Sequence, residues 1–291
     1  MSEASAILTW PLLVSQLAIF GTAAFALMLA PATIDDGRHS SPSFIAIWRA
    51  LAVVIVIISP MLFIAMASGM AQITWTQVPP LIPQIVRETY AGRLWMWRFG
   101  AVAMLAIVAW VPERARFTSA GLMAISAILI LLGSLISHAI DKGPFAVAIY
   151  CVHQMAAGIW LGALASLLIA SRRADAAHQW IEIDAMTARV SSVCGWSVAV
   201  MLVSGPYTAF ERLGWNLKLL SDSAYGRTLL LKLAIATPAL ILGAYNRYRL
   251  VPTVAEARVR AQLVRSVMIE CVLLIAVMGW SAVLANTPPP H

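Results

Sequence analysis

Long apolar segments recur along the whole chain and constrain its fold more than any other feature. Each has close to the ~20 residues that an α-helix needs to cross the hydrocarbon core of a bilayer. Because backbone groups in lipid must bond within their own segment, the pattern predicts an all-α integral membrane protein with eight transmembrane helices. No soluble domain of ordinary size fits between the segments, so we expect one membrane domain over residues 1–291. The segments lie at about 7–30, 47–72, 93–111, 118–138, 147–170, 190–209, 227–246 and 265–285.

Composition supports this prediction and excludes several classes of function. Hydrophobic residues make up 61% of the chain and charged residues 11%, against about 25% charged in soluble domains. The formal net charge is +7, yet no basic run alternates with aromatic residues, so we expect no nucleic-acid partner. Cys151, Cys194 and Cys271 lie in three different segments, which predicts neither a disulfide framework nor a zinc site. No catalytic motif is present, so we do not expect an enzyme.

The distribution of basic residues predicts the topology. An even number of spans places both termini on one side of the membrane. The loops after the odd-numbered segments hold Arg38, Arg49, Arg114, Arg116, Arg172, Arg173, Arg189, Arg247, Arg249, Arg258, Arg260 and Arg265. The opposite side has Arg87, Arg93, Arg98, Lys142, Arg212, Lys218, Arg227 and Lys232. Since cytoplasmic loops carry the excess of Lys and Arg, we expect both termini in the periplasm of a bacterial inner membrane. The acidic N-terminal stretch predicts that the first segment is not a cleaved signal peptide.

The two halves of the sequence show a weak internal repeat, about 7–138 and about 147–286. Corresponding residues are separated by 134 to 137 positions, and four segments per copy would make the repeats parallel. The pairs are Arg93 with Arg227, Arg98 with Lys232, Gly69 with Gly205, Gln16 with His153, and Gly21 with Gly158. The sequence therefore predicts two parallel four-helix repeats that meet where the first copy ends and the second begins.

A candidate metal site lies at this junction. His138 closes one apolar segment and His153 opens the next, with only a short polar break around Lys142 between them. Ionisable groups in membrane spans are functional candidates by default, because the bilayer otherwise excludes them. Met66 and Met70 are spaced i,i+4 in the outer half of the second segment. Thioether and imidazole ligands together suit a soft ion, above all Cu(I). Packing alone is the alternative role for these methionines.

Other polar and aromatic residues in the segments receive structural interpretations. Glu270 lies near the depth of Asn246 and Arg247, so we expect it to bond the seventh and eighth spans together. Arg98 and Lys232 lie near the outer surface and are expected to extend their charged ends outward to it. Most tryptophans near span ends are expected to form an interfacial belt: Trp75, Trp95, Trp97, Trp160, Trp215 and Trp280.

Several short motifs in matching order resemble the copper resistance protein D (CopD) family. They are HQMAAGIWLGAL from His153, SAYGRTLLLKLAI from Ser223, Asn246-Arg247 followed by Leu250-Val251-Pro252, and Glu270 ahead of a span that ends at Asn286-Thr287-Pro288-Pro289. The resemblance implies an inner-membrane protein of copper resistance that moves copper into the cytoplasm and works with a periplasmic CopC-type copper-binding protein. It also implies membrane histidine and methionine ligands, here His138 and His153. Relatives often have further histidines where this chain has Tyr150 and Ser15-Gln16.

Together these features favour a copper permease that takes copper ions from the periplasm through His138 and His153, helped by Met66 or Met70. Two alternatives stay open. Two histidines on neighbouring helices can also ligate a haem, which would make the chain a b-type haem-binding oxidoreductase. The chain could also be a scaffold for periplasmic copper proteins that transports nothing itself.

Overall fold

The computed structural model describes residues 3–28, 42–111, 115–177, 180–214, 216 and 218–287, which contain helices and no strand. The long helices are α1 (Glu3–Met28), α2 (Pro42–Ala71), α4 (Tyr90–Trp110), α5 (Ala115–Ile136), α6 (Pro144–Ala177), α7 (Trp180–Leu213), α9 (Ala224–Tyr245) and α10 (Ala257–Ala285). The short elements are η1 (Trp75–Gln77), η2 (Pro79–Leu81), α3 (Ile82–Glu88), η3 (His138–Lys142), α8 (Leu219–Asp222), η4 (Asn246–Leu250) and η5 (Val251–Thr253).

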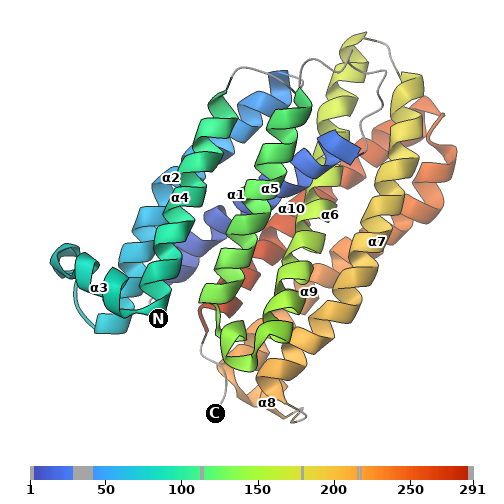
Figure 1. Ribbon diagram of the computed structural model, residues 1–291. Helices are drawn as coiled ribbons and strands as arrows, with labels where there is room; N and C mark the ends of the chain where they lie inside the picture. The colour runs from blue at the N-terminus through green and yellow to red at the C-terminus, as the bar shows by residue number, and fades with distance from the viewer. Residues whose placement is uncertain are drawn as a thin grey trace.

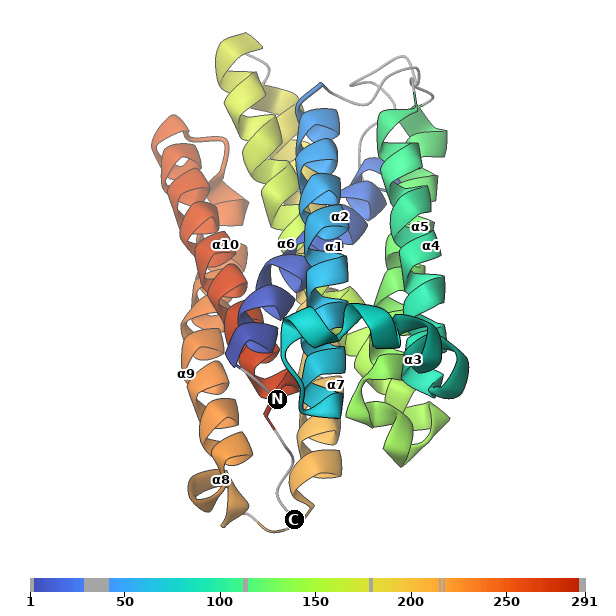
Figure 2. The ribbon, with the colours of Figure 1, turned by 90° about the vertical axis from the view of Figure 1, so that its left-hand side faces the viewer.

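Eight helices in the described ranges are long and apolar enough to cross a membrane, which confirms the predicted all-α membrane fold. They form one bundle in which α1 begins and α10 ends at the same end, beside α3 and α8 (Figures 1 and 2). The helices α7 and α10 begin at Trp180 and Ala257, earlier than the predicted spans at 190 and 265. Hydropathy detects only the part of a helix that lies in lipid, and these helices continue through polar turns beyond it.

The helix α1 is the centre of the bundle. It runs obliquely between the other helices (Figure 2) and packs against α2, α5, α6 and α10. Around it, α2 packs on α4 and α4 on α5, while α6 packs on α7 and α10, and α9 packs on α10. Little direct contact joins α7 to α9. The first four spans thus close into a ring, whereas the last four leave a gap between α7 and α9.

The helices α1 and α6 cross in close contact at three glycines. A Cβ atom on Gly21 would lie 1.8 Å from the carbonyl oxygen of Gly158 and 2.9 Å from Cα of Gly162. The i,i+4 spacing of Gly158 and Gly162 in the fifth span predicts a close contact with the fourth span, its neighbour in the chain, but the structure places both glycines against α1 instead. Small residues spaced i,i+4 allow two backbones to approach, but the spacing does not reveal which helix approaches.

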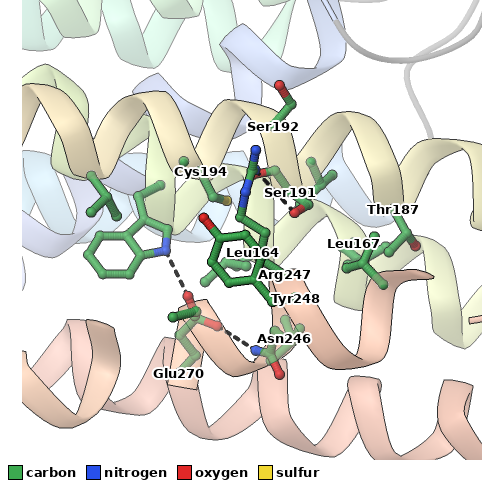
Figure 3. A pocket seen from close by; sticks show the side chains of 18 of the residues that line it. Leu164, Leu167, Thr187, Ser191, Ser192, Cys194, Asn246, Arg247, Tyr248 and Glu270 are labelled. Carbon is green, nitrogen blue, oxygen red and sulfur yellow. Dashed lines mark hydrogen bonds between the residues drawn. The ribbon is translucent and has the colours of Figure 1, made fainter. Parts of the chain in front are cut away.

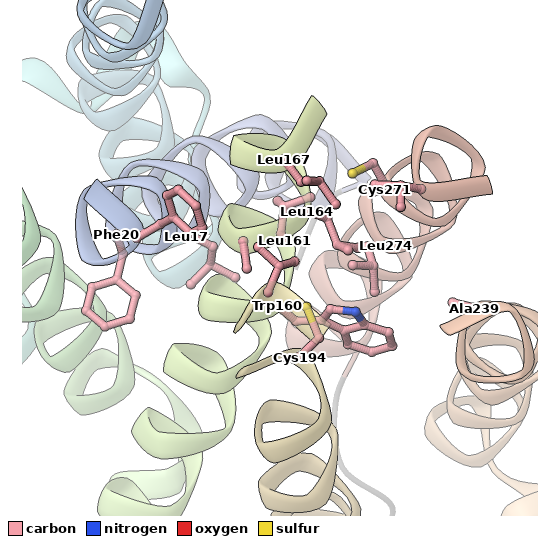
Figure 4. Packing of buried hydrophobic residues seen from close by; sticks show 14 of the residues in the cluster. Leu17, Phe20, Trp160, Leu161, Leu164, Leu167, Cys194, Ala239, Cys271 and Leu274 are labelled. Carbon is pink, nitrogen blue, oxygen red and sulfur yellow. The ribbon is translucent and has the colours of Figure 1, made fainter. Parts of the chain in front are cut away.

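Buried apolar side chains surround this crossing and fill the larger hydrophobic core. Figure 4 shows Leu17 and Phe20 of α1 near Leu161 and Leu164 of α6, with Cys271 and Leu274 of α10 on the other side. A separate cluster packs α1 against α2, α4 and α5 around the buried Trp48, whose indole donates to Thr22 Oγ1 at 2.9 Å. The first span therefore belongs to both cores.

Two helices in different halves begin in the same way. Thr89 caps α4 by accepting from the backbone N–H of Gly92 at 2.9 Å, and Ser223 caps α9 by accepting from that of Gly226 at 2.9 Å. In both cases a short helix precedes the capping residue, and the absence of a side chain on the glycine lets carbonyl groups of that short helix approach closely. These matching starts support the predicted internal repeat. The arrangement of the complete halves as two parallel four-helix repeats stays a prediction.

Candidate functional site

His153 lies in the third turn of α6 and points to α7. Its Nδ1 is 2.8 Å from Oγ of Ser204, and its Cε1 would be 3.5 Å from a Cβ on Gly205. The missing side chain at Gly205 leaves room for the ring, while Ser204 fixes its orientation. His153 is half-buried rather than fully enclosed.

The hydrogen bonds around Ser204 determine which ring nitrogen of His153 carries the proton. The Ser204 hydroxyl has one proton, which it donates to the carbonyl oxygen of Val200 at 2.7 Å. With this donation, the Ser204 oxygen accepts from His153, and in the neutral imidazole Nδ1 then carries the hydrogen while Nε2 keeps its lone pair. Histidine ligands in metal sites usually donate one ring N–H to a neighbouring oxygen and bind the metal through the other nitrogen. His153 is held in that form.

The other predicted ligands lie elsewhere or outside the described atoms. Met66 on α2 accepts a hydrogen bond from Nε1 of Trp95 at 3.2 Å, and Met70, one turn further on, is 63% exposed. Helix α2 packs on α1 and α4, whereas the partner of His153 is on α7. The backbone of His138 begins η3, and its side chain lies outside the described part of the structure. A shared site with these residues stays a prediction.

Removing the hydroxyl of Ser204 should weaken metal binding without removing the ligand. In the Ser204→Ala variant, Nδ1–H of His153 loses its acceptor, so neither the tautomer nor the ring orientation is fixed. Losses of this kind typically reduce metal affinity about 10- to 100-fold. We expect that reduction in a Cu(I) titration of the purified protein against a competing chelator. An unchanged affinity would show that Ser204 does not orient a ligand. Ser197→Ala, one of the other buried serines on α7, is the control.

The residue that corresponds to His153 in the first half is Gln16, which binds a buried arginine. Arg98 is 4% exposed and donates from Nη2 to Oε1 of Gln16 and from Nη1 to the carbonyl oxygen of Leu129, both at 3.1 Å. Its guanidinium also lies 5.3 Å from the ring centroid of Trp95. The expectation that Arg98 extends outward is therefore wrong. A backbone and an amide oxygen inside the bundle accept from both Nη atoms, so the guanidinium joins α1, α4 and α5, although its buried Nε has no hydrogen-bond partner.

A cavity of about 420 Å³ lies between α6, α7, α9, η4 and α10. Its walls are mostly apolar, with a small number of polar groups: Thr187, Ser191, Ser192, Cys194, Asn246, Arg247 and Glu270. Figure 3 shows Glu270 and Asn246 on one side and Cys194 with the serines of α7 opposite. The cavity lies in the gap between α7 and α9, which have little direct contact with each other.

Glu270 is the polar centre of this cavity. It is 2% exposed and accepts two hydrogen bonds, from Nε1 of Trp160 at 2.8 Å and from Nδ2 of Asn246 at 2.7 Å. Asn246 in turn accepts from the hydroxyl of Ser266 at 2.5 Å. The bond to Asn246 confirms that Glu270 joins the seventh and eighth spans. Trp160 adds the fifth span to the network, which corrects its assignment to an interfacial belt. Trp95 is buried as well.

The chain changes its helix type at the polar side of the cavity. Residues Asn246–Leu250 form a π-helical turn directly after α9, followed by η5 with Pro252. Arg247 in this turn donates from Nη1 to the carbonyl oxygen of Ser191 at 2.6 Å and stacks 5.9 Å from the ring centroid of Tyr248. Wide turns of this kind often occur at functional sites, because they place side chains at angles that a regular helix does not reach.

Sequence reasoning placed Glu270 but missed the cavity. The signal was available in part, because Cys194, Asn246 and Glu270 all lie at the same predicted depth in three different spans. What the sequence did not show is that α7 and α9 stand apart. In the described residues, no group of three or more His, Cys, Asp or Glu side chains is placed to hold a metal ion. A metal ion bound among the described residues would therefore have fewer than three His, Cys, Asp or Glu ligands.

Comparison with known proteins identifies relatives of this chain. The family description Copper resistance protein D matches residues 184–284, and Copper resistance protein D-like, N-terminal domain, matches residues 1–144. The chain is 27% identical over 253 residues to the inner membrane protein YebZ of Escherichia coli, with 85% of this chain and 84% of that protein aligned. It is 25% identical over 224 residues to the copper transport protein CutJ of Bacillus subtilis, with 73% of this chain aligned. That alignment spans 39% of CutJ.

No solved structure matches the chain. The family match rests instead on sequence over both halves of the protein. The N-terminal domain description covers the first half of the chain, and the Copper resistance protein D description covers most of the second half. An eight-helix membrane bundle with intramembrane polar groups agrees with a multi-pass inner-membrane protein. The chain belongs to the copper resistance protein D family.

Proposed function

We propose that this protein is a permease that moves copper from the periplasm to the cytoplasm and receives it at His153. The form of His153 carries the proposal. Its Nδ1–H is bound to a serine whose own proton is already used, so Nε2 is available to a metal. Nε2 makes no hydrogen bond within the described ranges.

Few and soft ligands suit transport better than storage. An ion must be bound well enough to enter and weakly enough to leave. A single imidazole with changeable neighbours meets this condition, and imidazole is a ligand that copper accepts. His138, Met66 and Met70 stay candidate partners that could join as the ion arrives. The printed name of the relative CutJ, copper transport protein, agrees with copper as the cargo.

Both termini and the end of the bundle nearest His153 are proposed to face the periplasm. A phosphatase that is active only in the periplasm, fused after His291, should therefore be active, and the same fusion in the loop around Arg258 should be inactive. The reason is the excess of arginine in the loops after odd-numbered spans, which stay cytoplasmic. The opposite pattern of activities would reverse the sides and place His153 at the cytoplasmic face.

The proposed copper donor is a periplasmic CopC-type copper-binding protein. Direct transfer requires that the acceptor histidine be near the surface at which the donor docks. His153 is nine residues from Pro144, the first residue of α6, which corresponds to about 14 Å along a helix. Copper handed to the protein there would still need an entry residue closer to the surface. His138 in η3 is the candidate for that step.

Copper content of cells tests the function. We expect cells that express the protein in a medium with added copper to accumulate more copper than cells with an empty vector. The excess should disappear when the protein is replaced by the His153→Gln variant at the same membrane level. Cells that accumulate less copper than the vector control would indicate export and contradict the proposed direction.

A further inference from the structure

The gap between α7 and α9 distinguishes the second half from the first. In the first half, the helices that correspond by chain order, α2 and α4, pack directly on each other. The ring centroids of Phe63 on α2 and Trp95 on α4 are 5.6 Å apart, and Nε of Arg49 donates to the carbonyl oxygen of Ala109 at 3.1 Å. In the second half, a cavity of about 420 Å³ takes the place of such contacts. A tightly packed bundle has little reason to keep a cavity of this size unless something enters it.

The charge in this cavity points to a positively charged occupant. Glu270 is 2% exposed, and both its hydrogen-bond donors, Trp160 and Asn246, are neutral. In the part of the chain that the structure describes, no Lys, Arg or His forms an ion pair with Glu270. An ionised carboxylate without a cation is unfavourable there, because two neutral donors replace only part of its hydration, so the group is neutral when the cavity is empty or is compensated by a cation when one enters. A cation that enters the cavity would compensate that charge.

Arg247 also lines the cavity, so its effect must be weighed. Its guanidinium is held by the carbonyl oxygen of Ser191 and the ring of Tyr248, and the residue is exposed. An exposed charge is screened by water, whereas a buried one acts through a low dielectric constant. Arg247 therefore adds a positive charge on the α7 side of the cavity, beside Gly195, but water screens this charge more than it screens the buried carboxylate of Glu270.

The opposite wall supplies a soft ligand. Cys194 of α7 lines the cavity, is a free cysteine and lies across from Glu270 (Figure 3). Thiolate is a ligand that selects Cu(I) over hard cations such as Mg²⁺ or Ca²⁺. One carboxylate and one thiolate bind Cu(I) only weakly, as a transient site on a transport path requires, because the ion must leave it again.

The cavity lies further along the contact between α6 and α7, the two helices that His153 and Ser204 join. On α7, Cys194 lies ten residues before Ser204, the partner of His153, which corresponds to about 15 Å along the helix. On α6, Trp160 lies seven residues after His153, or about 10 Å. Met201 of α7 lies between the two positions and packs against the core. An ion at His153 could therefore move inward along the contact between α6 and α7 and reach the cavity.

We propose that this cavity is a second, inner copper site, in which Cys194 and Glu270 hold Cu(I) on its way to the cytoplasm. The inference rests on the proposed transport function and adds a site to it. On binding, the S–H bond of Cys194 breaks, a S–Cu bond forms, and the proton leaves to solvent through the mouth of the cavity. The oxidation state of the copper does not change.

Alkylation of Cys194 tests the site without measuring transport. In a variant whose only cysteine is Cys194 (Cys151→Ser with Cys271→Ser), N-ethylmaleimide added to inside-out vesicles should react with the thiol. Cu(I), kept reduced with ascorbate, should slow this reaction about tenfold at ten times its dissociation constant, because it occupies the thiol for about 90% of the time. Adding Glu270→Gln should remove most of this protection, measured as the ratio of the rates with and without copper in the same variant, because the carboxylate charge also affects the reactivity of the thiol itself. The glutamine oxygen still accepts from Trp160.

The outcomes separate the inner site from the proposed function. Adding His153→Ala to the single-cysteine variant should leave the protection intact, because copper enters these vesicles from the cytoplasmic side. Protection that survives Glu270→Gln would overturn the role of the carboxylate. A thiol that copper does not protect, or that does not react at all, would overturn the inner site, even if His153-dependent transport is found. Protection without any transport would contradict the permease and retain the site.

Discussion

Replacing Gly21 by alanine is expected to prevent the bundle from assembling correctly. A Cβ atom at this position would lie 1.8 Å from the carbonyl oxygen of Gly158 and 2.9 Å from Cα of Gly162. Both neighbours are backbone atoms, so no side chain can turn away, and α1 must separate from α6 along its length. Overpacking in cores typically costs 1–3 kcal/mol, and occasionally more. Because α1 belongs to both hydrophobic cores, we expect a loss of at least about 3 kcal/mol in the free energy of unfolding.

The measurement is the yield and thermal unfolding of the protein purified in a mild detergent. Gly100→Ala is the matched control, because Gly100 also lies in a membrane helix, α4, but has no atom within 4 Å of the added Cβ. Alanine there should be neutral or slightly stabilising, since alanine favours helices by about 1 kcal/mol over glycine. If Gly21→Ala unfolds at the same temperature as Gly100→Ala, then α1 and α6 do not cross at these glycines.

Replacing His153 by alanine is expected to abolish copper accumulation in cells. The variant removes the imidazole that, among the described side chains, donates to Ser204 from Nδ1 and leaves Nε2 without a hydrogen bond. His153→Gln separates the ligand from the structural role. The glutamine amide can still donate to Ser204, and the corresponding position in the first half is Gln16. It offers copper only a harder oxygen instead of imidazole nitrogen.

Copper content per cell, at equal amounts of protein in the membrane, is the measurement for both variants. We expect both to fall to the level of the empty vector. A glutamine variant that accumulates copper as the original protein does would show that His153 acts only through its hydrogen bond to Ser204. In that case the metal must pass through other residues.

The sequence predicted the eight helices well because lipid enforces a simple rule. Only a long apolar helix satisfies its backbone there, so hydropathy alone locates the eight long helices apart from their polar ends. The hydrogen bond from the seventh span to Glu270 was predicted for the same reason. A carboxylate in lipid needs a partner, and Asn246 lies at the matching depth on the preceding span.

Contacts between helices could not be predicted, because hydropathy does not reveal which face meets which neighbour. Gly158 and Gly162 were correctly read as a close-approach surface, but the partner is α1 rather than α5. Arg98 was expected at the surface, yet the oxygens of Gln16 and Leu129 make burial possible. Trp95 and Trp160 were expected in an interfacial belt, but their indole N–H groups find partners inside the bundle.

The candidate site was predicted only in outline. His153 was recognised because an ionisable residue in an apolar span is unusual. The bond to Ser204 depends on the packing of α6 on α7, which no local pattern shows. Met66 and Met70 share a helix face in principle, but the structure places the first against Trp95 and leaves the second exposed. The cavity beside Glu270 results from two helices that stay apart, and a sequence does not show missing contacts.

The most direct test of the permease is copper movement across a membrane that contains no other protein. Liposomes would be prepared with the purified protein and a Cu(I)-responsive dye inside, and Cu(I) stabilised by ascorbate would be added outside. The account predicts that the dye responds in liposomes with the original protein and stays at the protein-free level with His153→Gln. A response equal to that of protein-free liposomes, or one that His153→Gln does not reduce, would contradict transport through His153.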